Sequence, residues 1–443
     1  MKFISIQEAI NKAKLSQVRS GSSKSQTKGK VAVRGWIYRE RGSNKLKFLV
    51  LRDSTNLIQC VLDRKKFEKK WDEIDKLQVE ASVEMEGTIK ADKRAPTGYE
   101  ISVDKINIVG LSDKFPIQKD LNEELLGDRR HLWLRSRKMV AIMKIRSTVI
   151  GAIHEYFRKK GFYEFQSPII IPGGAEEGPT MFELDYFDKK MYLAQTWQLY
   201  AEAAMYGLEK IYCVAPSFRA EKSKTSRHLT EYWHTEMEVA WADLNELMDY
   251  AEEMTKYVVK KVLEKNKNEL KILERDIKKL EPTIKKKFPR MTYDEALKKL
   301  NQKEMKLKWG KDLRTIEEEK LMEIYDTPVL VHHYPKEVMA FYKPRDPKNP
   351  KTARCFDMLA PEANGELIGG SERDTNIEEL KKSLKAKGEK LEDYSYYFDI
   401  HSYGAIPHGG YGLGTERLIK WICGLDTIKD AIAFPRTMTR WNP

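Results

Sequence analysis

Residues 209–241 read EKIYCVAPSFRAEKSKTSRHLTEYWHTEMEVAW, and this stretch decides the fold. Side-chain character alternates along residues 211–221 and again along 232–241, which is the period of β-strands, and a charged loop joins the two runs. The pattern predicts a hairpin that gathers Arg219, Glu221, Arg227, His228, Glu231, Tyr232, Glu236 and Glu238 around one loop. So many acids and bases are typical of a site that binds a polyanion beside a small zwitterion.

Length and composition indicate a globular protein with more than one domain. The 443 residues suffice for two or three domains, and 41% hydrophobic against 33% charged residues excludes a disordered chain. The formal charge of +13 fits a nucleic-acid partner and a lysine-rich solvated surface equally well. The 4 cysteines are far apart, and the sequence shows neither a secretory signal nor a membrane span. We therefore expect a cytoplasmic protein with no membrane contact.

Changes of pattern along the chain predict four segments. Residues 1–30 are expected to be a flexible basic segment apart from a short helix at the start. Residues 31–110 alternate in short strands with one interrupting helix, a pattern that suggests a five-stranded OB barrel but fits a generic small β-domain about equally well. Residues 111–130 combine Pro, Gly and mixed charge and are predicted to be a hinge. Residues 131–443 are expected to form a second, larger domain.

The barrel segment carries the pattern G-W-x-x-x-x-R-x-x-x-x-x-x-F-x-x-L-R-D, followed by I-Q-C-V. This pattern resembles the N-terminal anticodon-binding domain of the aspartyl-, asparaginyl- and lysyl-tRNA synthetases. The resemblance implies that Phe48 stacks on an unpaired tRNA base while Gln59 and Glu100 read the edge of that base. Without the resemblance, the same residues would fit a core phenylalanine and two solvated polar side chains equally well.

The second domain carries three further patterns. The hairpin contains F-R-A-E and R-H-L-T-E-Y, residues 412–417 read G-L-G-T-E-R, and a long helix leads into a strand that ends at Pro168. These segments resemble motifs 2, 3 and 1 of the class II aminoacyl-tRNA synthetases in the aspartyl/asparaginyl/lysyl subgroup, and the likeness extends from about Val31 to Pro443. It implies an α+β protein in which an OB-fold barrel precedes a catalytic domain with a mainly antiparallel sheet flanked by helices. It also implies a homodimer formed through motif 1.

The family's reaction explains the residue types. The amino-acid carboxylate attacks the α-phosphate of ATP, giving an aminoacyl-adenylate that tRNA then accepts, and this step needs positioning and charge neutralisation. By resemblance, Arg219 holds the α-phosphate, while Tyr232 and Arg417 cover the two faces of adenine. The remaining ATP-binding residues implied are Glu221, Arg227, His228, Leu229, Glu366 and Gly414. Asp357 and Glu366 are implied to hold Mg²⁺, and Arg219, Arg417 and Glu366 are expected to be catalytic.

Specificity is implied by the residues around Q-x-x-Q-L-Y at 195–200. Aspartyl enzymes typically carry a lysine at the position of Ala201, whereas asparagine enzymes carry an apolar residue followed by glutamate, here Glu202. A carboxylate at Glu202 can accept a hydrogen bond from an asparagine amide and would repel aspartate. The resemblance adds three more contacts for L-asparagine: Glu176 for the amino group, Gln198 in the pocket, and Arg373 for the side-chain carbonyl oxygen.

Three alternatives to an asparagine-activating synthetase remain open. An aspartyl-tRNA synthetase, possibly one that does not discriminate between tRNAs, is opposed by the absence of a lysine at Ala201. An amide-forming relative that makes asparagine from aspartate and ammonia is opposed by the OB-like domain. A non-catalytic RNA-binding protein is opposed by the intact catalytic residues. Trp197 and Lys343 depart from the family, which usually has a small residue or proline and a methionine at these positions.

Overall fold

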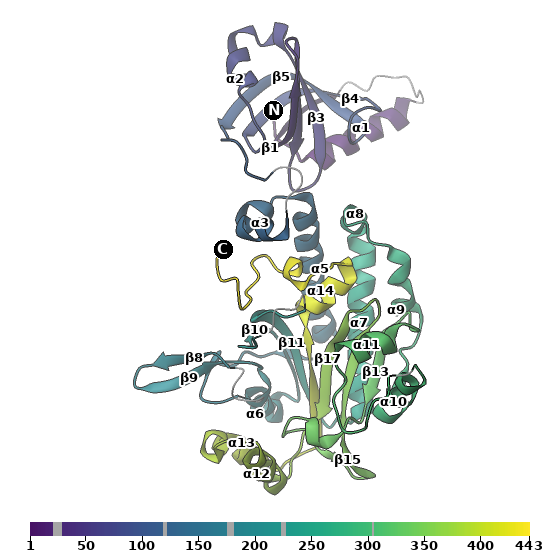
Figure 1. Cartoon of the computed structure of the whole chain (residues 1–443). Helices are drawn as coiled ribbons and strands as arrows, with labels where there is room; N and C mark the ends of the chain where they lie inside the picture. The colour runs from purple at the N-terminus through teal and green to yellow at the C-terminus, as the bar shows by residue number, and fades with distance from the viewer. Residues whose placement is uncertain (21–28, 118–121, 175–180, 223–226, 304) are drawn as a thin grey trace. The chain divides into compact units, whose positions relative to one another are not determined.

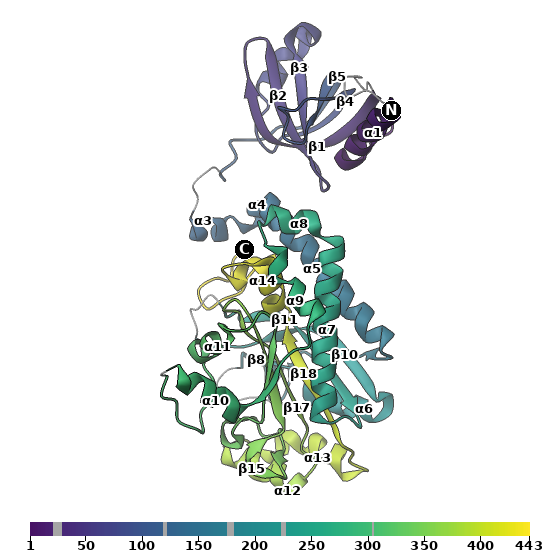
Figure 2. The ribbon, with the colours of Figure 1, turned by 90° about the vertical axis from the view of Figure 1, so that its right-hand side faces the viewer.

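The computed structural model describes residues 1–20, 29–117, 122–174, 181–222, 227–303 and 305–443. It divides into two compact units, Met1–Leu126 and Gly127–Pro443, and the boundary falls inside the predicted hinge at 111–130. Figures 1 and 2 show the chain in two views. Within the described ranges, no helix is long and apolar enough to cross a membrane.

The first unit is a closed five-stranded barrel with the strand order β1-β2-β3-β5-β4. Its elements are β1 (Gly29–Gly42), β2 (Leu46–Arg52), β3 (Leu57–Asp63), α2 (Trp71–Asp75), β4 (Ser82–Ala91) and β5 (Tyr99–Gly110). Among the described strands of this unit, only β3 and β5 pair in parallel. Buried residues alternate with partly exposed ones along β2 and β4, so alternate side chains fill the interior. The predicted OB barrel is confirmed.

The short helix expected at the start of the N-terminal segment is present, and it extends further along the chain than the composition predicts. Helix α1 (Ile6–Ser20) packs on the barrel, and its buried face consists of Ile6, Ala9, Ile10 and Ala13. The physical reason is their spacing, because apolar residues at i, i+3, i+4 and i+7 form one stripe along a helix. The Ser/Gly/Lys-rich composition that suggested a linker lies mainly at residues 16–30, and residues 21–28 are outside the described part of the chain.

The second unit is organised around an eight-stranded sheet with the order β12-β13-β16-β17-β18-β11-β10-β6. Its strands are β6 (Tyr163–Glu164), β10 (Lys210–Phe218), β11 (Glu231–Ala240), β12 (Arg290–Thr292), β13 (Val329–His332), β16 (Cys355–Ala360), β17 (Gly365–Glu372) and β18 (His408–Gly414). The pairings are antiparallel except β6 with β10 and β12 with β13. The predicted mainly antiparallel sheet of a class II catalytic domain is therefore confirmed.

Three helices cover one face of this sheet and bury the largest apolar core of the unit. They are α5 (Arg137–Lys159), α7 (Leu244–Lys265) and α14 (Thr415–Cys423), and Figure 2 shows α7 running along the strands. A smaller apolar cluster joins α6 (Gln198–Leu208), α12 (Ile377–Ala386) and α13 (Ser395–Ser402). The other helices and strands are α3 (Glu123–Asp128), α4 (Arg130–Trp133), β7 (Ile170–Ile171), β8 (Glu183–Tyr186), β9 (Lys189–Leu193), α8 (Lys267–Ile272), α9 (Glu281–Lys285), α10 (Tyr293–Gln302), α11 (Thr315–Met322), β14 (Arg345–Asp346) and β15 (Asn349–Ala353).

Candidate active site

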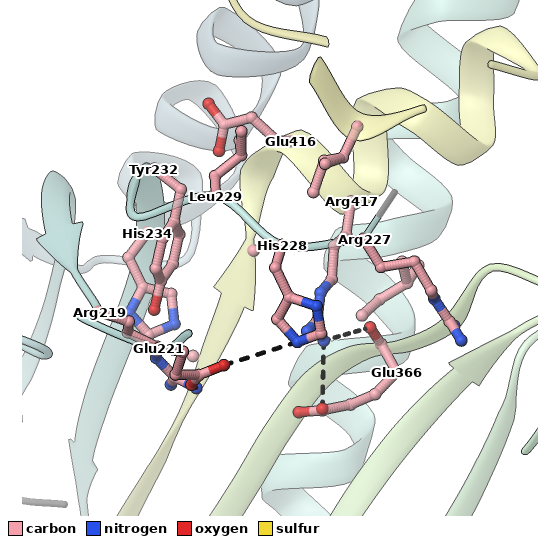
Figure 3. Close-up of a pocket in the computed structure, with 14 residues that line it drawn as sticks. Arg219, Glu221, Arg227, His228, Leu229, Tyr232, His234, Glu366, Glu416 and Arg417 are labelled. Atoms are coloured by element: carbon pink, nitrogen blue, oxygen red, sulfur yellow. Dashed lines mark hydrogen bonds and ion pairs between the residues drawn. The ribbon is translucent and has the colours of Figure 1, made fainter. Parts of the chain in front are cut away.

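The sheet register brings the motif-like segments together. Ser217 pairs with Tyr232 across the β10–β11 hairpin, and His234 of β11 pairs with Gly414 of β18. Figure 3 shows the resulting cleft, which we call the nucleotide cleft and which spans about 640 Å³ including space open to solvent. All the residues that the resemblance assigns to ATP line it: Arg219, Glu221, Arg227, His228, Leu229, Tyr232, Glu366, Gly414 and Arg417.

Charged groups in the nucleotide cleft are paired loosely and remain partly open to solvent. Arg417 donates from Nη1 to the backbone oxygen of Glu366 at 2.9 Å and to its Oε2 at 3.2 Å. Arg219 lies 3.7 Å from a carboxylate oxygen of Glu221, and its guanidinium lies 5.8 Å from the ring centre of Tyr232. The side chains of Arg219 and Arg417 are 32% and 31% exposed. Desolvation disfavours the charge of Glu366, but Arg417 and Arg219 lower its pKa. Phosphate oxygens entering the cleft would find two accessible guanidinium groups.

Arg227 is held by a helix that the sequence patterns do not connect to the site. Its guanidinium lies 3.7 Å from a carboxylate oxygen of Glu318 and 3.4 Å from one of Glu319, both on α11. In Figure 3 the side chain points away from His228. Gly365 has a φ of +64°, and a Cβ there would collide with the Arg227 guanidinium. Burial and the charge of Glu366 raise the pKa of Glu318 to about 7.

A second cavity of about 780 Å³ adjoins the nucleotide cleft, and we call it the amino-acid cavity. The two share Arg219, His234, Glu366 and Gly412 as wall residues. Gln198 and Arg373, which the resemblance assigns to the amino acid, also line it. A ligand in one space therefore lies directly beside a ligand in the other.

Arg373 lies in the wall of the amino-acid cavity with its charge already balanced. Its Nε and Nη2 both donate to the carboxylate of Glu238, the first at 3.2 Å, and its Nη1 donates to Ser371 Oγ at 2.6 Å. The ring of Tyr342 lies 5.2 Å from the guanidinium carbon. The Arg373 side chain is 4% exposed, so this paired geometry is fixed before any ligand arrives.

Glu202 is fully buried at 0% exposure, which excludes a solvent-facing helix residue. It accepts hydrogen bonds from Gln198 Nε2 at 3.0 Å and Tyr397 OH at 2.7 Å, and its Oε2 lies 3.1 Å from His408 Nε2. Arg373 Nε lies 3.8 Å away. Among the described residues that line the amino-acid cavity, neither Glu202 nor Ala201 appears. Glu202 therefore acts on the cavity through Gln198 and Arg373 rather than by direct contact.

The buried partners of Glu202 also set the ionisation of this group. Burial would raise the pKa of Glu202, but the hydrogen bond and charge of His408, followed by Arg373, lower it to about 2. Burial disfavours the imidazolium form of His408, yet the hydrogen bond and charge of Glu202 raise its pKa. The pair is therefore ionised on both sides in weakly acidic solution.

Two further wall residues, His234 and Glu236, belong to no motif used above. Glu236 accepts from the Trp197 backbone N–H at 3.0 Å and from Thr196 Oγ1, and its carboxylate lies 3.3 Å from His234 Nδ1. Gly412 makes room for the imidazole, since a Cβ there would collide with His234. The sequence contains a pattern that could have indicated these two residues, because the period of two along β11 puts His234, Glu236 and Glu238 on one face of the strand. Trp197 itself is buried and donates to the Phe165 carbonyl at 2.8 Å, so it anchors α6.

The predicted magnesium ligands Asp357 and Glu366 face each other over Gly369. A Cβ on Gly369 would lie 3.1 Å from Glu366 Oε1 and 3.5 Å from Asp357 Oδ1, so this glycine leaves a cradle between two carboxylates. The described residues contain no group of three or more His, Cys, Asp or Glu suited to a metal ion. Two carboxylates nonetheless fit Mg²⁺, which commonly takes its other oxygens from phosphates and water. Burial, followed by the charge of Glu366, raises the pKa of Asp357 well above its ordinary value.

The barrel brings its three predicted base-reading residues together. Gln59 Nε2 donates to Glu100 Oε2 at 2.8 Å, and these residues are cross-strand partners on β3 and β5. Arg41 donates to Gln59 Oε1 at 3.3 Å while its guanidinium lies 4.9 Å from the ring centre of Phe48. Lys90 Nζ lies 3.0 Å from Glu100 Oε1. Glu176, predicted to bind the amino group, lies outside the described residues.

Comparisons with known proteins cover nearly the whole chain. Residues 122–438 match the family model "tRNA synthetases class II (D, K and N)", and residues 31–109 match the model "OB-fold nucleic acid binding domain". The asparagine–tRNA ligase of Thermoplasma acidophilum is 46% identical over 423 residues, which covers 95% of this chain and 98% of the relative. That of Thermococcus gammatolerans is 44% identical over 430 residues, covering 97% and 100%. The crystal structure of asparaginyl-tRNA synthetase from Pyrococcus horikoshii complexed with asparaginyl-adenylate matches with a TM-score of 0.93 at 42% identity, covering 100% of both chains.

Proposed function

The chain belongs to the class II tRNA synthetases of the D, K and N group, and we propose that it activates L-asparagine with ATP and transfers the asparaginyl group to tRNA. The prediction of an aminoacyl-tRNA ligase from the sequence is thereby confirmed. The observation that carries the proposal is the shared wall of the two spaces, formed by Arg219, His234, Glu366 and Gly412. It lets a carboxylate in the amino-acid cavity meet a phosphate in the nucleotide cleft, as adenylate formation requires.

In the nucleotide cleft, arginine side chains of the chain neutralise the negative charge of the ATP phosphates. Arg219 stands on the shared wall, which supports a role for its guanidinium in holding the α-phosphate as the substrate carboxylate attacks and pyrophosphate leaves. Tyr232 and Arg417 would enclose adenine. Asp357 and Glu366 would hold Mg²⁺, which neutralises phosphate charge when bound.

In the amino-acid cavity, asparagine is preferred over aspartate because the positive charge of Arg373 is already balanced by buried carboxylates. Arg373 can donate to a side-chain carbonyl oxygen, but Glu238 already neutralises it, and Glu202 places a second carboxylate 3.8 Å away. An aspartate carboxylate beside Arg373 would therefore meet a guanidinium whose charge two carboxylates already balance, and like charges in a desolvated pocket repel strongly. The fully buried Ala201 offers no cation either. This reasoning and the relatives favour asparagine over the aspartyl and amide-forming alternatives.

The same proposal extends to tRNA and to assembly. Phe48, Gln59 and Glu100 would read an anticodon base on the barrel. A homodimer would form through the motif-1-like segment, where Tyr163, Ile169 and Ile170 are 60%, 42% and 39% exposed and offer apolar area to a second copy. The 4 free cysteines, Cys60, Cys213, Cys355 and Cys423, are all buried, which suits the reducing cytoplasm.

Pyrophosphate exchange into ATP tests the activity directly. We expect exchange that depends on asparagine and is at least about 100-fold weaker with aspartate, consistent with several kcal/mol of repulsion in the cavity. Equal exchange with aspartate would refute the specificity, and no exchange with any amino acid would refute the enzyme. Charging of a tRNA transcript with the asparagine anticodon, beside one with the aspartate anticodon, tests the transfer step.

A further inference from the structure

The guanidinium of Arg227 lies in a seat formed by α11 and the first residue of β17. Its Nη1 donates to Glu319 Oε1 at 3.4 Å, and its Nη2 lies 3.7 Å from Glu318 Oε2. Gly365 completes the seat, because a Cβ there would collide with both the Arg227 guanidinium and the Glu318 carboxylate. We call Glu318, Glu319 and Gly365 the α11 seat. Three segments far apart in the sequence therefore meet around one positive charge.

The α11 seat distinguishes Arg227 from the other two arginines of the nucleotide cleft. The side chain of Arg227 is 16% exposed, whereas those of Arg219 and Arg417 are 32% and 31% exposed. All three line the cleft, but Glu318 and Glu319 are absent from its described lining residues. The two acids thus hold Arg227 from behind the wall, and a bound polyanion would reach the same guanidinium from the cleft.

The position of Arg227 also indicates which part of a nucleotide it would meet. Arg219 lines both the cleft and the amino-acid cavity, whereas Arg227 lines the cleft and is absent from the described lining of the cavity. Arg227 therefore lies away from the wall where the amino-acid carboxylate would attack. Its seat residue Gly365 directly precedes Glu366, which also lines the cleft. A cation in this place suits the phosphates that leave as pyrophosphate.

We propose that Glu318 and Glu319 are positioning residues that act through Arg227, competing with the pyrophosphate end of the nucleotide for its guanidinium. An arginine that two carboxylates already share attracts phosphate less strongly, because the acids offset its charge and repel the phosphate. When pyrophosphate leaves, the α11 seat offers the guanidinium partners at once. The acids thus weaken binding of this product and favour its release. The role of pyrophosphate as a product rests on the proposed function.

Binding of magnesium pyrophosphate to the full-length protein, measured by calorimetry, tests this competition. Glu319→Gln removes one competing charge, so it should bind magnesium pyrophosphate at least about threefold more tightly than the unaltered protein. Glu319→Asp keeps the charge and should recover most of the unaltered affinity. Glu323→Gln is the matched control. This acid lies just after α11 and pairs with Lys303 and Lys320 instead, so its removal should leave the affinity unchanged.

A double-mutant cycle shows whether the acid acts through Arg227. Arg227→Ala should weaken binding of magnesium pyrophosphate about tenfold, since a cation that faces phosphate is lost. In the Arg227→Ala background, Glu319→Gln should have no further effect, because the shared partner is gone. A carboxylate that repelled pyrophosphate directly, or merely supported the fold, would change the affinity equally in both backgrounds. Circular dichroism and thermal midpoints verify that each variant is folded.

Three outcomes would overturn the proposal: unchanged affinity in Glu319→Gln, weaker affinity in that variant, or equal tightening with and without Arg227. Weaker affinity would mean that the acids hold Arg227 ready for phosphate rather than compete for it. Asparagine-dependent exchange is measured separately on the unaltered protein. If exchange is absent while the affinity shift appears, the competition at the α11 seat stands and the proposed function falls. If exchange is present without the shift, the proposed function stands and the competition falls.

Discussion

The two halves of the site, the nucleotide cleft and the amino-acid cavity, use charge in opposite ways. In the cleft, Arg219 and Arg417 are about one-third exposed, and the ion pair between Arg219 and Glu221 is 3.7 Å long. Around the cavity, Arg373 and Glu202 are 4% and 0% exposed, and each has several polar partners at hydrogen-bond distance. The cleft is an open set of cations that a polyanion completes. The cavity wall is complete before the ligand arrives.

This difference indicates which side chains contribute to catalysis alone and which contribute to both catalysis and folding stability. Removing a group from the cleft should cost catalysis but little stability, because exposed ion pairs contribute little to folding. Removing a group from the network behind the cavity should cost both, because it leaves a buried charge without its partner. The predictions below test that distinction, beginning with the largest expected effect.

Arg219→Ala should abolish most activity and leave the fold intact. We expect asparagine-dependent pyrophosphate exchange to fall about 1000-fold, or about 4 kcal/mol of transition-state stabilisation, since a donor aimed at developing charge is lost. The thermal midpoint should move by no more than about 2 °C. Arg219→Lys keeps the charge without the planar fork and should recover only part of the rate. A large loss of stability in Arg219→Ala would contradict the claim that side chains of the nucleotide cleft contribute little to folding stability.

Glu202→Gln should lower both stability and selectivity. The neutral amide leaves His408 and Arg373 short of a buried negative charge, so the free energy of unfolding should fall by about 3 kcal/mol in urea titrations. The asparagine-to-aspartate ratio in exchange should fall at least about tenfold, because a repelling carboxylate is gone. The matched control is Glu221→Gln in the cleft, where the acid is 33% exposed. Equal destabilisation by the two substitutions would contradict the difference between the halves.

Phe48→Ala should leave both halves of the site unaffected. Stacking of one base on an aromatic ring contributes about 1–3 kcal/mol, so kcat/KM for tRNA charging should fall about 10- to 100-fold. Pyrophosphate exchange without tRNA should remain within about twofold of the unaltered protein, since the barrel residue takes no part in activation. Parallel loss in both assays would remove Phe48 from the base-reading role.

The smallest effect is a pH dependence of opposite sign in the two halves. The pKa of His408 is raised, so its stabilising pairing is fully present below the unfolded value of 6.5 and is lost as pH rises through the folded value. The stability advantage of the unaltered protein over His408→Gln should therefore shrink as pH rises from 6 to 9. Chemical unfolding at several pH values measures this difference.

His228 in the nucleotide cleft provides the counterpart. Burial lowers its pKa despite the opposing charge of Glu221, so its contribution is present above 6.5 and lost as pH falls through the folded value. The advantage of the unaltered protein over His228→Gln should thus grow with pH. The change should be smaller than for His408, because the His228 side chain is 36% exposed. If the stability difference changed with pH in the same direction for His408→Gln and His228→Gln, the opposite pKa shifts of the two histidines would be contradicted.

The predictability of the two halves from the sequence differs for a physical reason. The nucleotide cleft is built mainly from the β10–β11 hairpin and the start of α14, where side chains close in sequence share a motif. The predicted ATP residues accordingly lie in one cleft, although their roles stay predictions. The amino-acid cavity is different. Asp312 lines it, and the buried groups behind its wall include Tyr397, His408 and Glu238. These residues lie on separate elements and come together only when the domain packs. No local spacing indicates that Tyr397 approaches Glu202.

For the fold as well, features with a local sequence pattern could be predicted and features that depend on packing could not. Strand alternation and motif order predicted the barrel and the antiparallel sheet, and both are confirmed. The N-terminal helix was underestimated, because its apolar stripe covers few residues beside a strongly polar composition. Helix α11, which holds Arg227, carries no pattern that points to the site.

The hairpin between β16 and β17 also bears on how relatives of this chain are found. Its pairing slips in register between Met358 and Leu359, and both Glu362 and Ala363 in the turn have positive φ. The pairing thus tolerates an irregular register near the turn while Asp357 stays opposite Gly369. Insertions at this turn would lengthen the interval from Asp357 to Glu366 without moving either carboxylate off the sheet. A search pattern that fixes the number of residues between two such acids would discard working enzymes, whereas one that requires their cross-strand relation would keep them.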